Sequence, residues 1–112
     1  MDFGQYFKEL RREHKFTQRE LAKKIGVSHT YISKIENDAL PAPSRDMLEN
    51  VAKVYKMDSA NDLLIAAKII PNDVKNAIRE DEELLRFLIE TPLEDILKIK
   101  EKYYLEKIKN DN

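Results

Sequence analysis

A single glycine between two short helical patterns is the feature that most restricts how this chain can fold. Thr17 and Glu20 are spaced as a capping box, which predicts that a helix starts there. Gly26 ends that helix where a left-handed backbone is needed, and Ser28 can cap the next one. The inward positions of the two helices are Leu21, Ala22, Ile25, Val27, Tyr31, Ile32 and Ile35. Residues 18–37 are therefore predicted to form two short helices packed across a tight turn.

The rest of the chain also has helical periodicity, so the predicted fold class is all-α. Apolar residues recur at spacings of three and four, and no alternating apolar and polar run suggests a hairpin. Pro41 and Pro43 mark the clearest loop, and Pro71 interrupts the chain again. A capping box at Thr91 and Glu94, with Pro92 as the first helical residue, predicts the start of the last helix. We expect helices over about 3–13, 17–25, 28–37, 44–55, 59–67, 72–79, 81–90 and 91–109.

Composition excludes several classes of site. The chain has no Cys, which excludes a disulfide framework, a thiol nucleophile and a Cys-ligated metal. Its two His, His14 and His29, leave little for a metal site, and we expect His14 to be solvated; no metal and no cofactor are expected. Acidic clusters lie where helix N-termini are predicted, which the helix dipole explains, so we expect no catalytic residues and no enzyme. With no apolar run of about 18 residues and no signal-peptide pattern, a cytoplasmic protein without membrane contact is expected.

The formal net charge of −1 hides an asymmetry between the two halves of the chain. Residues 1–56 contain 11 Lys/Arg and 8 Asp/Glu, whereas residues 57–112 contain 9 Lys/Arg and 13 Asp/Glu. The front half is therefore basic by three charges and the back half acidic by four. Together with the break at Pro71, this difference predicts two parts with different roles, residues 1–70 and residues 71–112.

From Phe7 to about Leu64 the sequence resembles the lambda-repressor/Cro-like helix-turn-helix family, also called the xenobiotic-response-element family. The matching segments are LRREHKFTQRELAKKIGVSHTYISKIEND, the proline-containing loop and LENVAKVYKMD. The resemblance implies a five-helix DNA-binding bundle, followed here by a C-terminal helical extension. It also implies a two-fold dimer that binds operator DNA with its third helix in the major groove.

The resemblance assigns DNA-contacting roles to residues on and around the third helix. Those expected to read base edges are Ser28, His29, Thr30, Ser33 and Lys34. Those expected to contact phosphates are Gln18, Arg19, Tyr31, Asn37 and Arg45, with Tyr31 also contributing to the core. Arg11 and Glu36 match a pair that forms a buried salt bridge in some relatives, and we interpret both as structural.

The back half carries an apolar face that must be covered by something. The residues assigned to a dimer or partner contact are Leu84, Phe87, Leu88, Leu93, Ile96, Leu97, Tyr104 and Ile108, with Lys100 interrupting the stripe. This face could fold back on the same chain, pair with a second subunit, or bind a regulatory protein or peptide; we favour the dimer.

These patterns predict a sequence-specific transcriptional regulator, a repressor that binds a palindromic operator as a dimer. One alternative is an antitoxin-type regulator whose C-terminal helices bind a partner protein. Another is an adaptor module that binds no DNA.

Overall fold

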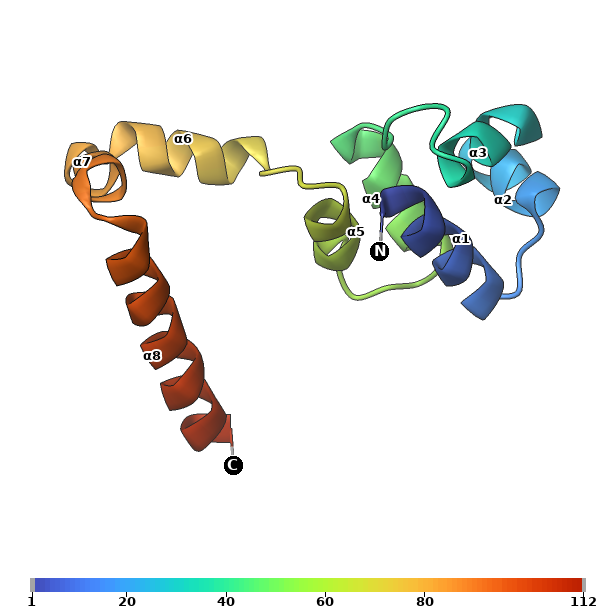
Figure 1. Cartoon of the computed structure of the whole chain (residues 1–112). Coiled ribbons are helices and arrows are strands. Elements are labelled where there is room, and N and C mark those ends of the chain that lie inside the picture. The colour runs from blue at the N-terminus through green and yellow to red at the C-terminus, as the bar shows by residue number, and fades with distance from the viewer. Residues whose placement is uncertain (1, 112) are drawn as a thin grey trace. The chain divides into compact units, whose positions relative to one another are not determined.

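The computed structural model describes residues 2–111, and within that range it consists of helices and connecting loops without strands. In chain order the helices are α1 (Phe3–Glu13), α2 (Gln18–Ile25), α3 (His29–Glu36), α4 (Arg45–Val54), α5 (Asn61–Ala66), α6 (Asn72–Glu80), α7 (Glu82–Glu90) and α8 (Leu93–Asp111) (Figure 1). The all-α prediction is confirmed, and the predicted elements are all present with ends that shift by a few residues.

The start of the last helix differs from the prediction. The carbonyl of Pro92 accepts from the amide of Ile96 at 3.2 Å, and α8 begins at Leu93. Pro92 therefore occupies the N-cap position, one residue later than the predicted cap at Thr91, and Thr91 instead ends α7 as its C-cap. A proline is compatible with either position, because it has no amide that would need a partner.

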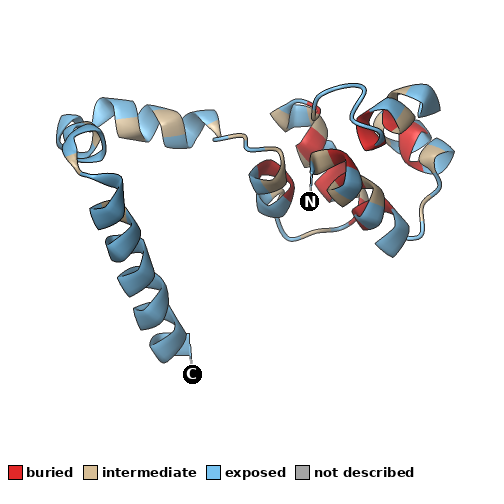
Figure 2. Ribbon diagram, in the orientation of Figure 1, coloured by how far each residue is buried: buried red, intermediate tan, exposed pale blue. Residues whose placement is uncertain are grey.

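The hydrophobic core lies among α1 to α5. The most deeply buried side chains come from these five helices: Phe7, Leu21, Ile32, Ile35, Leu48, Val51 and Leu63. Figure 2 shows the buried positions gathered in this part of the chain. Each helix contributes only one apolar face, so burying these side chains requires all five helices together.

The chain divides into two compact units, the first ending at Pro71 and the second beginning at Asn72. In the second unit α6 packs against α7, and none of its described residues is buried. No helix among residues 2–111 is both long and apolar enough to cross a membrane.

Candidate nucleic-acid interface

The α2–turn–α3 segment is held by caps at each helix end. The Thr17 hydroxyl accepts from the Glu20 amide at 3.0 Å, and the Glu20 carboxylate accepts from the Thr17 amide at 3.1 Å. Gly26 has a φ of 77°, a left-handed conformation that a side chain would disfavour. The Ser28 hydroxyl then accepts from the Tyr31 amide at 3.1 Å and starts α3. These local hydrogen bonds and the Gly26 turn fix where α2 ends and where α3 begins.

Helix α3 buries one side and exposes the other. Ile32, Ile35 and Glu36 are buried against the core, whereas residues about half a turn away face solvent. Thr30 and Lys34, four residues apart, share the side opposite Ile32. Of the predicted base-reading set, the structure exposes Ser28, His29, Thr30 and Lys34 and leaves Ser33 half-buried. The exposed members give α3 a polar surface with one positive charge, suited to a hydrogen-bonding partner.

The residues predicted to contact phosphate differ in their exposure and in the hydrogen bonds that their side chains make. Arg19 and Asn37 are exposed, and Asn37 ends α3 while donating to the Ser33 hydroxyl at 3.4 Å. Tyr31 is half-buried. Arg45, also half-buried, donates from Nε to a Glu49 carboxylate oxygen at 3.1 Å, so that end of its side chain has a partner within α4.

The half-buried Gln18 and the buried pair Arg11–Glu36 form one hydrogen-bonded network. The Nε and Nη2 groups of Arg11 donate to the two oxygens of Glu36 at 2.7 and 3.0 Å. Nη1 of Arg11 donates to the Phe16 carbonyl at 2.7 Å, and Nε2 of Gln18 donates to Glu36 at 3.1 Å. The hydrogen bond with Glu36 raises the pKa of the Arg11 guanidinium above its ordinary value, so Arg11 keeps its positive charge. This network ties α1 and the loop before α2 to the last residue of α3.

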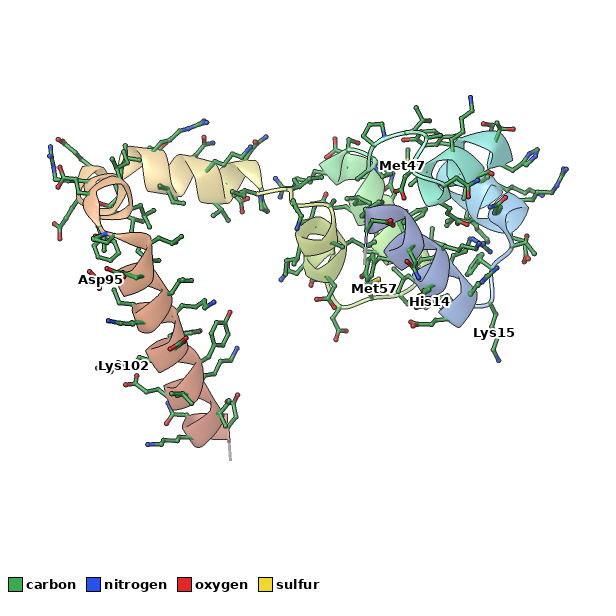
Figure 3. All side chains as sticks on the ribbon, in the orientation of Figure 1. His14, Lys15, Met47, Met57, Asp95 and Lys102 are labelled. Atoms are coloured by element: carbon green, nitrogen blue, oxygen red, sulfur yellow. The ribbon has the colours of Figure 1, made fainter. Side chains whose placement is uncertain are left out.

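Sequence reasoning missed a second polar group near this network. His14 was expected to be solvated, but it is half-buried: its ring stacks on Tyr55 with centroids 4.2 Å apart, and Nδ1 bonds the Leu10 carbonyl at 2.9 Å. Figure 3 shows His14 at the end of α1. Burial raises the pKa of the Tyr55 hydroxyl, which has no hydrogen-bond partner among the described residues. The helical spacing signalled that Tyr55 points inward but could not show what covers it.

The predicted contact face of the second unit is open. Its members Leu84, Phe87, Leu88, Leu93, Leu97, Tyr104 and Ile108 are between 37% and 69% exposed, and Ile96 is half-buried. The apolar surface is also wider than the predicted stripe, because Ile99, Tyr103 and Leu105 are exposed as well. Helix α8 has no buried residue among those that the structure describes.

Two short helices joined by a glycine turn, with the second exposing its first turn, define a helix-turn-helix domain of the DNA-binding type. A family model described as "Helix-turn-helix" matches residues 7–60. The chain belongs to this lambda-repressor/Cro-like helix-turn-helix family, whose members are DNA-binding transcription regulators and not enzymes. The predicted family and the absence of an enzymatic role are therefore confirmed.

Two curated relatives match part of this chain. The protein named "Uncharacterized HTH-type transcriptional regulator RghRB" of Bacillus subtilis (strain 168) is 36% identical over 77 residues, 67% of this chain and 55% of the relative. The HTH-type transcriptional regulator SinR of the same organism is 41% identical over 51 residues, 46% of each chain. The matched part thus spans about half the length of these relatives.

Solved structures give the same class. A crystal structure of SinR, described as the master regulator for biofilm formation in complex with DNA, has a TM-score of 0.50 and 39% identity, covering 55% of this chain and 97% of that one. The SinR/SinI protein complex has a TM-score of 0.51 and 26% identity, covering 94% of this chain and 98% of that one. The clp gene regulator ClgR of Corynebacterium glutamicum also has a TM-score of 0.51 and 26% identity, covering 79% and 89%.

Proposed function

We propose that this protein binds a palindromic DNA operator as a homodimer and represses transcription from the promoter it occupies. The observation that carries the proposal is the exposed polar side of α3, held by caps and by Gly26 against the rest of the first unit. The SinR structure described as a complex with DNA supports it, because that chain shares 39% identity with this one.

In this proposal the start of α3 enters the major groove. His29 and Thr30 lie at its tip, and Lys34 follows one turn later on the same side. A lysine ammonium can donate to the O6 and N7 acceptors of guanine, and a threonine can bond either kind of base edge. Ser28 is a weaker base-reading candidate, since its oxygen already caps α3. Ser33 is limited by its half-buried position.

Phosphate contacts would fix the register of α3 on the duplex. The capping box occupies the amides of Thr17 and Glu20, which leaves the first-turn amides of Gln18 and Arg19 available to an anion at the N-terminus of α2. Arg19 adds an exposed positive charge beside them. Asn37, at the opposite end of α3, would contact a phosphate on the other side of the groove.

The second unit is proposed to hold the dimer together. Its exposed apolar residues on α7 and α8 form a surface that water does not favour, and a second copy presenting the same surface would cover it symmetrically. A two-fold dimer matches a palindromic operator, because each first unit then meets one half-site. The acidic balance of residues 57–112 also favours keeping this unit away from DNA.

A second candidate role for the same surface is binding a regulatory protein. The structure described as the SinR/SinI protein complex covers 94% of this chain, including helices beyond the helix-turn-helix domain. A partner helix that covers α8 would compete with self-association, and so would weaken binding to a two-site operator.

The proposal is tested with matched charge variants. Lys34→Ala removes a cation from the reading side of α3, whereas Lys102→Ala removes one from α8 (Figure 3). Lys34→Ala should weaken operator binding roughly five- to 150-fold for each half-site, the effect of about 1–3 kcal/mol for a good base contact, and relax base preference at one position in each half-site. Equal, small effects of both variants would show that α3 does not read DNA.

A further inference from the structure

The carboxylate of Glu36 has a bond that a purely structural ion pair does not need. Its side chain is 1% exposed, and its partner Arg11 already contacts both of its oxygens. Even so, one of those oxygens also accepts from Gln18, the first residue of α2. Gln18 lies at the N-terminus of α2, where a phosphate is proposed to bind, and Glu36 directly precedes Asn37. The network therefore includes one residue proposed to contact phosphate and adjoins another.

We propose that Glu36, whose charge is balanced by Arg11, is a positioning residue that holds the Gln18 carboxamide in the orientation in which it binds a DNA phosphate. This inference rests on the proposed DNA binding and goes further by assigning the buried pair a role in it.

The chemistry of the groups explains how Glu36 orients Gln18. An ionised carboxylate only accepts hydrogen bonds, so it must face the NH2 end of the carboxamide and not its oxygen. One N–H of Gln18 is then used by Glu36, and the second remains for a phosphate oxygen beside the free amides of the first turn of α2. Fixing this side chain before binding also removes part of the entropy loss that an unrestrained glutamine would suffer.

Arg11 has a second consequence in this arrangement. A bare carboxylate so close to a phosphate would repel it, and at low dielectric that repulsion would be strong. The bidentate contact from Arg11 neutralises Glu36 while leaving it able to accept from Gln18. The guanidinium also bonds the Phe16 carbonyl in the loop before α2, so the same group sets the position of that loop.

The test removes the network without leaving a buried charge. Replacing both partners of a buried ion pair by apolar residues is often neutral or stabilising, so the variant with Arg11→Met and Glu36→Met is expected to fold. A random-sequence duplex at about 50 mM salt is the probe, because phosphate contacts do not depend on sequence. Gln18→Ala is measured alone and in the double-methionine background, with Gln5→Ala, the chain's other glutamine, as the control.

We expect the double-methionine variant to bind the duplex several-fold more weakly while its resistance to urea is unchanged or higher. Gln18→Ala should cost about tenfold in the wild-type background and little in the double-methionine background, and Gln5→Ala should change nothing. Unchanged affinity of the double-methionine variant, or a full additional loss from Gln18→Ala in it, would overturn the inference. If the wild-type chain itself fails to bind any duplex, the proposed function fails first.

A measurement on the wild-type chain keeps the inference testable if the double variant does not fold. The side-chain amide protons of Gln18 and Gln5 can be assigned by NMR because the sequence has only these two glutamines. Gln5 donates to an exposed Glu9 at 3.4 Å, a long bond open to solvent. The Gln18 protons should exchange with water more slowly than those of Gln5, and equal exchange rates would show that Glu36 does not hold Gln18.

Discussion

Replacing Gly4 with alanine tests the contact between α1 and the end of α3. A Cβ built at Gly4 would lie 2.6 Å from the Ile35 carbonyl oxygen and 2.8 Å from that of Glu36. It would also lie 2.6 Å from a carboxylate oxygen of Asp38. Two of these neighbours are backbone atoms that cannot rotate away. Accommodating even one methyl group therefore requires α1 to move away from α3.

The magnitude follows from two opposing effects. Alanine is favoured over glycine inside a helix by up to about 1 kcal/mol, so a Gly4→Ala change with free space around it would stabilise α1. Overpacking in a closed interface typically costs about 1–3 kcal/mol. Because the close contacts at Gly4 involve two carbonyl oxygens, we expect the overpacking cost to exceed the gain in helix propensity. The net loss of stability should be about 1–2 kcal/mol. For a unit of this size that lowers Tm by roughly 5–15 °C.

The assay is urea unfolding followed by the methyl resonances of Ile32 and Ile35, which report on the first unit alone. Gly26 provides the control, because it has a φ of +77° and nothing within 4 Å of a built Cβ. Asparagine tolerates that backbone, so Gly26→Asn should be milder than Gly26→Ala, whereas Gly4→Asn should be worse than Gly4→Ala. A Gly4→Ala variant that is more stable than the wild type would refute the reasoning.

Three further changes test other parts of the structure. Tyr55→Phe removes a buried hydroxyl that has no hydrogen-bond partner among residues 2–111, so stability to urea should stay the same or rise. A loss of about 1 kcal/mol or more would show that the hydroxyl makes a stabilising hydrogen bond. Desolvation and the nearby Asp2 carboxylate raise the pKa of Asp38. Ionising Asp38 therefore costs more free energy in the folded chain than in the unfolded chain. Asp38→Asn should therefore raise Tm at pH 7, and that gain should vanish as the pH falls below the ordinary aspartate pKa. Leu97→Glu places a charge on the open face of α8, so sedimentation should show a shift toward monomer while the circular dichroism of the chain is retained.

The helix-turn-helix segment could be predicted from sequence because its signals are local. The capping box at Thr17, the glycine turn and the cap at Ser28 each depend on residues within one or two turns, and all three occur in the structure as expected. The inward positions Ile32 and Ile35 follow from helical spacing in the same way.

Contacts between distant residues could not be predicted from those signals. The bond from Gln18 to Glu36 joins residues 18 positions apart, and the stack of His14 on Tyr55 joins two helices that only the tertiary fold brings together. The importance of Gly4 could not be predicted either, because it depends on the close approach of the backbone at Ile35 and Glu36. Such features depend on how the helices pack, which periodicity leaves undetermined.

The most direct test of the central claim is selection of bound duplexes from a random pool with the full chain. Two half-sites of inverted sequence should be enriched, with their centres separated by about one helical turn of DNA or a multiple of it. Lys34→Ala should change the preferred base at one symmetric pair of positions, and Lys102→Ala should select the same sequence as the wild type. Enrichment of no common sequence, or of a single half-site without symmetry, would contradict a dimer that reads a palindrome through α3.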